Sequence, residues 1–147
     1  MFPDLDKIFN NAKTLNERFE LRFVIDEEVK QDIIKLNTKD QLFDKGIDSL
    51  DKTLGNYSQT SVNKYGKRPG HIQLFDEGDF YGSFVIHVTT DEIVIKADTI
   101  KEDTDLSVRY GNDILGLTND NLDFVIREYI LENYQEYIMN ALMEGVK

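Results

Sequence analysis

Residues 84–95 read FVIHVTTDEIVI, and their pattern indicates that the fold contains β-structure. Apolar side chains occupy every second position at Phe84, Ile86 and Val88, and they return at Ile93 and Ile95 after the polar run TTDE. Alternation with period two is typical of a half-buried β-strand, and a polar break between two such runs is typical of a hairpin. The sequence therefore predicts a β-hairpin, which needs further strands or a helix on its apolar face to be stable.

The residues before the hairpin predict one more strand. Residues 72–75 (IQLF) would add it, so that a small antiparallel sheet of three to four strands occupies about 72–98. Between this strand and the hairpin, three carboxylates surround Gly78. We interpret this stretch as a turn in which glycine supplies an unusual backbone angle.

Helices are predicted on both sides of the sheet. Apolar side chains recur at intervals of three and four residues over about 4–45, which predicts two amphipathic helices or one broken helix, and Gly46 suits the left-handed position that ends a helix. The same rhythm over about 118–143 predicts a C-terminal helix with Thr118 as its N-cap. The sequence thus predicts an α+β fold in which N-terminal and C-terminal helices pack with the sheet.

Two connections join these elements within one predicted domain, residues 1–147. About 46–71 contains four glycines and few apolar residues, and we expect a long loop there. About 98–117 is rich in acids, and we expect a solvated connection.

Composition narrows the classes of function. The chain has no cysteine, no basic and apolar start of a signal peptide and no apolar run long enough to span a membrane, so we expect a soluble, cytoplasmic protein that contacts no membrane. Its net charge of −11 disfavours binding to a phosphate backbone.

The charge is unevenly distributed. No acid occurs between Lys52 and Phe75, whereas that stretch contains Lys52, Lys64, Lys67 and Arg68, which leaves −15 on the remaining chain. One interpretation is a basic loop that attracts an acidic neighbour, because complementary charge speeds encounter and fixes register. The other is a solvated loop that merely lacks acids.

No constellation of residues predicts catalysis or metal binding, and we expect no cofactor. Asp76, Glu77 and Asp79 do not follow the spacing of a calcium loop, and carboxylates in a polar turn lack the apolar pocket that a catalytic acid needs. His71 and His87 cannot form a metal site alone.

Three tyrosines occur on the predicted C-terminal helix. Tyr129 and Tyr137 share its apolar stripe and are expected in the core. Tyr134 lies off that stripe and is the better candidate for an interface.

The order of these pieces resembles the tail-completion and virion-morphogenesis proteins of tailed bacteriophages, which are head-tail joining or neck proteins. That family carries the pattern D-x-x-G-x-x-W-x-x-L-S-x-x-T after a helix, and the corresponding residues here are Asp48, Leu54, Tyr57, Ser58 and Ser61. Asp51 stands where the family more often has glycine.

Two further patterns extend the resemblance over about residues 29–140. The pattern L-x-x-T-G-x-L-x-x-S is matched by Leu74, Gly78, Phe80 and Ser83, with Glu77 in place of the threonine. The pattern F-L-G-L-S is echoed by ILGLT at 114–118, which contains Gly116. A closer resemblance is to uncharacterised proteins from phages of Bacteroidetes hosts, which share LNT-x-x-QLF-x-KGIDS, LG-x-YS and ILGLT.

The resemblance implies a structural virion protein that is not an enzyme. It implies a homo-oligomeric ring, generally of six or twelve copies, assembled in the bacterial cytoplasm and located at the joint between the portal or connector and the tail. DNA would pass this joint without specific binding. In such a ring we expect Lys64, Lys67 and Arg68 to contact an acidic face of an adjacent subunit or connector protein.

Two other functions stay open. An acidic inhibitor that mimics DNA and binds a basic enzyme would present regularly spaced carboxylates on one exposed face. A small hydrolytic enzyme would use the turn that contains Asp76, Glu77 and Asp79.

Overall fold

The computed structural model describes residues 4–15, 20–67 and 69–146, and it shows the α+β class that the sequence predicts. In its first half lie α1 (Leu5–Ala12), η1 (Leu21–Phe23), α3 (Glu27–Lys35), the π-helix η2 (Leu36–Lys45), α4 (Gln59–Tyr65) and α5 (Asp79–Gly82). In its second half lie β1 (Val85–Val88), β2 (Ile93–Lys96), β3 (Ile100–Lys101), β4 (Thr104–Asp105), α6 (Leu106–Tyr110), η3 (Asn112–Ile114), α7 (Asn119–Val125), the π-helix η4 (Ile126–Leu131) and α8 (Glu132–Met143).

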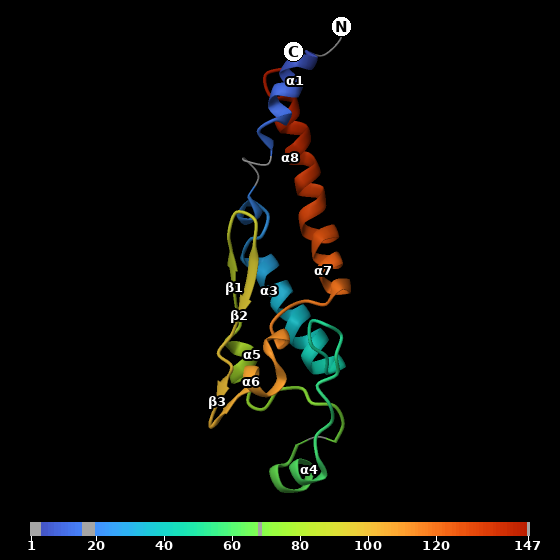
Figure 1. Cartoon of the computed structure of the whole chain (residues 1–147), viewed down its shortest axis with the longest axis vertical. Helices are drawn as coiled ribbons and strands as arrows, with labels where there is room; N and C mark the ends of the chain where they lie inside the picture. The colour runs from blue at the N-terminus through green and yellow to red at the C-terminus, as the bar shows by residue number, and fades with distance from the viewer. Residues whose placement is uncertain (1–3, 16–19, 68, 147) are drawn as a thin grey trace.

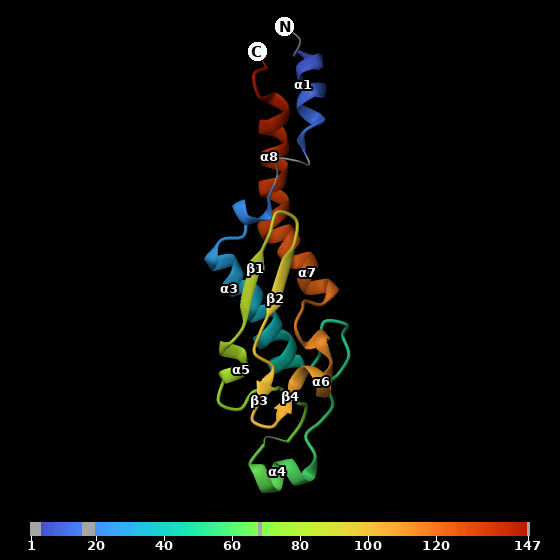
Figure 2. The same ribbon diagram turned by 60° about the vertical axis from the view of Figure 1, so that its left-hand side comes forward.

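The molecule is elongated (Figure 1). One end consists of α1 beside the far half of α8, and both chain termini lie there, whereas α4 forms the opposite end. Asn11 joins the two terminal segments, because its side-chain amide donates to the carbonyl oxygens of Leu142 at 2.8 Å and Glu144 at 3.0 Å. The middle contains α3, α7 and the β1–β2 hairpin (Figure 2).

The N-terminal region forms separate helices, in agreement with the first of the two predicted alternatives. The carboxylate of Asp26 caps α3 by accepting from the Val29 amide at 2.9 Å, and α3 continues directly into η2. Gly46 ends η2 with φ +64°, so its predicted left-handed position is confirmed.

The hairpin is also confirmed, with Val85 opposite Lys96 and Val88 opposite Ile93. Ile86 is buried and His87 is exposed on opposite faces of β1. The expectation of a third strand at 72–75 is wrong. Leu74 has φ +55°, which no strand accommodates, so Ile72 and Leu74 reach the core from an irregular segment.

Both predicted connections contain elements that the sequence did not indicate. The expected loop at 46–71 includes α4, capped by the Ser58 hydroxyl, which accepts from the Ser61 amide at 3.1 Å. The acidic connection at 98–117 contains a second small antiparallel sheet, β3–β4, and the short helices α6 and η3. The strands of the described chain therefore form two separate pairs instead of one sheet.

The C-terminal helix begins after Thr118, as predicted, and runs through α7, η4 and α8 to Met143. The Thr118 hydroxyl accepts from the Asn121 amide at 3.2 Å. Tyr129 is not a simple core residue, because its hydroxyl donates to Asp32 at 2.7 Å. This hydrogen bond to a carboxylate, with burial, raises the pKa of Tyr129 to about 12.

Two clusters of buried apolar side chains form the core. The first joins η2, the irregular segment, α5 and α6 through Leu42, Ile72, Leu74, Phe80, Phe84, Leu106 and Ile114. The second joins α3, the hairpin and α7 through Ile25, Val29, Ile33, Ile86 and Val125. Ile34 and Ile95 pack against both, so the hairpin and α3 link the two clusters.

Candidate functional site

The two most buried polar side chains form a clamp on the segment 114–118. Asn37 and Gln41 lie one turn apart on η2, and both are fully buried. The Asn37 amide donates to the Ile114 carbonyl at 2.9 Å and accepts from the Gly116 amide at 2.8 Å. The Gln41 amide donates to the Gly116 carbonyl at 2.8 Å and accepts from the Thr118 amide at 2.9 Å. Side chains thus satisfy this buried backbone as a neighbouring strand would.

The residue at position 116 of this clamp is a glycine because the chain passes close to Ser49 there. A Cβ at Gly116 would meet the Ser49 Cβ at 3.1 Å, and the Ser49 amide donates to the Asp113 carbonyl at 2.8 Å. Asp48 shapes the same turn, since its carboxylate accepts from the amides of Leu50 at 2.9 Å and Lys52 at 3.0 Å. The stretches LNT-x-x-QLF-x-KGIDS and ILGLT, distant in sequence, are therefore one structural unit.

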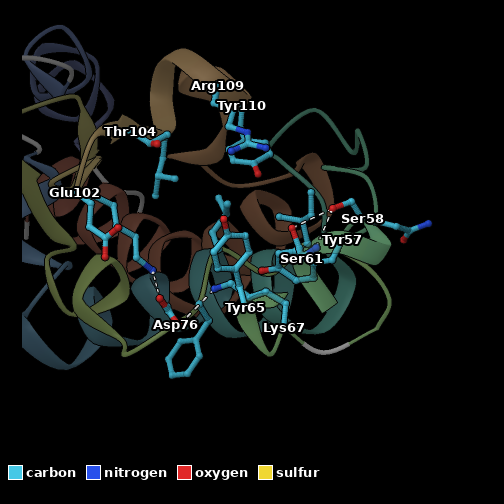
Figure 3. A pocket seen from close by; sticks show the side chains of 16 residues that line it. Tyr57, Ser58, Ser61, Tyr65, Lys67, Asp76, Glu102, Thr104, Arg109 and Tyr110 are labelled. Atoms are coloured by element: carbon cyan, nitrogen blue, oxygen red, sulfur yellow. Dashed lines mark hydrogen bonds and ion pairs between the residues drawn. The ribbon is translucent and has the colours of Figure 1, made fainter. Parts of the chain in front are cut away.

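An open cavity of about 560 Å³ lies at the α4 end of the molecule (Figure 3). Its walls come from α4 and its flanks, the irregular segment 72–76, the β3–β4 turn and α6. Backbone hydrogen bonds close the α4 loop, which we define as residues 57–70, at its base. The Tyr57 amide donates to the Gly70 carbonyl at 2.9 Å, and the Ile72 amide donates to the Gly55 carbonyl at 2.8 Å.

One carboxylate in the cavity forms ion pairs with two lysines. Asp76 lies 3.4 Å from the Lys67 ammonium and 3.0 Å from the Lys101 ammonium (Figure 3). Lys101 first, and Lys67 second, hold the pKa of the Asp76 carboxyl below its ordinary value of 3.8. A general acid needs the opposite shift, so Asp76 is suited to organising the two cations.

Aromatic side chains and a third cation complete the walls. The Lys67 ammonium lies 5.8 Å from the Tyr57 ring centre, and the Arg109 guanidinium lies 5.5 Å from the Tyr110 ring centre. Arg109 is exposed and, among the residues that the structure describes, forms no ion pair with a carboxylate. The lining contains three basic side chains and only two acidic ones, Asp76 and Glu102.

The structure separates the residues that the sequence predicted for partner contact. Lys67 lines the cavity, whereas Lys64 is exposed on α4 beside Tyr65. Arg68 lies outside the described residues. Tyr134 is half-buried on α8, in the other half of the molecule (Figure 1).

The residues of the second family pattern have structural roles. Leu74 and Phe80 are buried, and Gly78 has φ +89° at the start of α5, which confirms its predicted unusual angle. The Ser83 hydroxyl donates to the Phe80 carbonyl at 2.6 Å and accepts from the Asp98 amide at 2.9 Å.

Sequence reasoning missed Lys101, Arg109 and Tyr110 as cavity residues. They belong to the stretch interpreted as a solvated acidic connection, where Lys101 and Arg109 are the only basic residues. The pair Arg109-Tyr110 repeats the basic-aromatic pair Lys64-Tyr65, and that repetition was the one available signal.

Within the described residues, no group of three or more His, Asp or Glu side chains is placed to hold a metal ion. None of the helices in that part of the chain is both long and apolar enough to cross a membrane. Comparison with protein-family models, curated proteins and solved structures gives no match.

Proposed function

We propose that this chain is a structural virion protein of a tailed bacteriophage, a tail-completion or neck subunit that forms a ring between the portal or connector and the tail. The observation that carries the proposal is a cavity with three basic and two acidic side chains in its lining, at one end of an elongated chain whose net charge is −11. A ring requires a heterologous contact, in which one patch meets a different patch on the next copy. This molecule offers two unlike surfaces of that kind.

The resemblance supports the same proposal through residues that contact each other. The stretches at 36–49 and 114–118 that carry it meet in the Asn37 and Gln41 clamp. They define one scaffold that holds the Asp48 turn against the segment before α7. In the proposed ring, an acidic lumen would let DNA slide past without binding.

Interrupting the gene in a phage that encodes this chain tests the proposal. The expected result is DNA-filled heads and complete tails that stay separate, with joining restored by the protein supplied from a plasmid. Normal infectious particles from the interrupted phage would contradict it.

A second candidate function is an acidic inhibitor that mimics DNA. The observation that favours it is a row of exposed glutamates at four-residue intervals on η4 and α8, namely Glu128, Glu132 and Glu136, which we call the glutamate row. A helix places such residues about 6 Å apart. DNA carries one charge per about 1.7 Å of its axis, so the row is sparser than the polymer it would imitate.

Binding experiments separate the two functions. An inhibitor would bind a basic nucleic-acid enzyme as a single copy and compete with DNA. A ring subunit would instead appear in a high-mass assembly of its own copies.

A further inference from the structure

We propose that the cavity beside α4 binds the glutamate row of a neighbouring copy of this chain. This contact deepens the proposed assembly function and rests on it, because it names the two surfaces that meet. Four observations carry the proposal.

The first observation is that the cavity lining has three basic side chains against two acidic ones, an excess of one positive charge. Asp76 is shared between Lys67 and Lys101, whose side chains are only 26% and 36% exposed. Arg109 has no carboxylate partner within the described chain. A carboxylate that approaches Arg109 can form charge-assisted hydrogen bonds with its guanidinium, and the two lysines lie in the same cavity. The cavity is therefore chemically suited to carboxylates.

The second observation is the chemistry around the two surfaces. The cavity has Tyr65 and Tyr110 in its lining, and Val108 on α6 is 83% exposed beside Arg109. Leu131 and Met139, which are 42% and 59% exposed, occur in the same helical stretch as the glutamate row. Interfaces are enriched in tyrosine, arginine and methionine, so both surfaces carry apolar contact area next to their charges.

The third observation is the position of the two surfaces in the molecule. The cavity lies at the α4 end, whereas the glutamate row lies on the helix that extends toward the opposite end (Figures 1 and 2). One copy cannot close its own cavity with its own row in this arrangement. The contact therefore joins two different copies through unlike patches. Repeated head to tail it builds a ring, whereas in an antiparallel pair it would occur twice.

The fourth observation concerns the alternative occupant, nucleic acid. The net charge of −11 opposes the approach of a nucleic acid and of a second copy alike, so the choice between these two occupants rests on the short-range contacts at the cavity. A partner helix brings apolar side chains to the tyrosines, which a phosphate backbone does not. The observations therefore favour a second copy.

Cysteine cross-linking tests the contact directly, because the chain has no cysteine of its own. Val108→Cys places a thiol beside the cavity, and Gln135→Cys places one on the exposed surface of α8 next to the row. A short bis-maleimide should join the two variants when they are mixed. Each variant alone should give at least about tenfold less dimer, because its thiol then faces a patch of the neighbouring copy that has no cysteine.

Charge reversal on each surface supplies the matched control. Lys101→Glu with Arg109→Glu in the Val108→Cys chain, or Glu132→Lys with Glu136→Lys in the Gln135→Cys chain, should each lower the mixed cross-link about tenfold or more. Mixing the two reversed chains should restore it. Unchanged thermal unfolding of each variant would show that the fold is intact.

Several outcomes would overturn the proposal. They are the absence of mixed dimers at every protein concentration, dimers of Val108→Cys with itself at equal yield, and a yield that charge reversal does not change. The result is separable from the proposed function. If mixed dimers form but phage without the protein still joins heads to tails, this contact is kept and the neck function is rejected. If no mixed dimers form but loss of the protein leaves heads and tails separate, the neck function is kept and this contact is rejected.

Discussion

At the scale of single residues, the polar side chains of η2 contribute more to the fold than the helical period suggested. The helical spacing of apolar residues predicts that Ile33 and Leu42 face the core, and both are buried. It assigns no role to Asn37 and Gln41, because their value depends on a backbone segment that meets η2 only in the folded chain. No local pattern can predict such a contact.

Replacing either clamp residue should destabilise the protein strongly. Asn37→Ala leaves the Ile114 carbonyl and the Gly116 amide without their partner, and each buried unsatisfied group costs about 1–3 kcal/mol. We therefore expect urea unfolding to show a loss of about 2 kcal/mol or more for Asn37→Ala. Lys35→Ala, an exposed change next to η2, is the control. Equal stability of the two variants would refute the structural role of the clamp.

Gly46 and His71 should be energetically coupled. A Cβ at Gly46 would lie 2.5 Å from the His71 ring, and the residue has φ +64°. The left-handed angle alone costs alanine roughly 1–2 kcal/mol, and the clash adds to it. We expect the double variant Gly46→Ala/His71→Ala to be more stable than the sum of the single changes indicates, by about 0.5–3 kcal/mol.

A double-mutant cycle in urea measures this coupling. His71→Ala also removes the 2.7 Å contact of its ring nitrogen with the Phe43 carbonyl, and that loss appears in both arms of the cycle. Strict additivity would mean that the helix end and the His71 ring do not touch.

Asp76 should make the α4 end sensitive to acid. Its pKa is depressed by Lys101 and Lys67, so its contribution to the free energy of unfolding is present above the ordinary value of 3.8 and is lost as the pH falls through the lower folded pKa. The carboxylate is half exposed, so we expect at most about 1 kcal/mol. The stability gap between wild type and Asp76→Asn should thus be present at pH 7 and close in stronger acid.

Glu77→Gln, an adjacent exposed change, is the control for thermal unfolding across this range. A gap that widens as the pH falls would have the wrong sign for a carboxylate stabilised by lysines.

Among the elements, sequence periodicity predicted those that bury an apolar stripe in one of the two core clusters. The hairpin, the helix from Glu27 to Lys45 and the C-terminal helix each bury side chains in a core cluster, although Leu122, Phe124 and Ile126 of the C-terminal helix are exposed. The helix α4 does not, because none of its residues is buried, so only its cap and Gly66 could have indicated it. Residues 72–75 were wrongly predicted as a strand, because Ile72 and Leu74 are both buried although the segment that carries them is irregular.

Removing the hydroxyl of Ser58 and removing that of Thr118 should therefore change the free energy of unfolding by different amounts. Ser58 caps α4, which packs on little, whereas Thr118 caps α7 and is itself buried in the clamp. Thr118→Ala should lower the free energy of global unfolding by about 1 kcal/mol or more. Ser58→Ala should leave global unfolding nearly unchanged and increase amide exchange in residues 59–65 alone.

Hydrogen exchange read by mass spectrometry, together with thermal unfolding, measures both effects. Global destabilisation by Ser58→Ala would show that α4 is coupled to the core more tightly than its contacts indicate.

For the molecule as a whole, charge distribution and shape are the features on which the proposed assembly rests. The sequence showed that one stretch lacks acids, and Lys67 from that stretch does reach the cavity. It could not show that Asp76 of the same chain pairs with Lys67, or that Lys101 and Arg109 join it from beyond the hairpin. Those proximities depend on tertiary structure. The sequence therefore predicted a basic loop where the structure has a cavity lined by four segments.

We propose that copies of this chain form a closed ring in a phage neck, and the mass of the assembled species distinguishes a ring from single copies. Native mass spectrometry of neck complexes released from purified particles should give a cyclic multiple of the 17.1 kDa chain, six or twelve copies being the expected values. Absence of the chain from the particle, or its presence only as single copies, would contradict the claim.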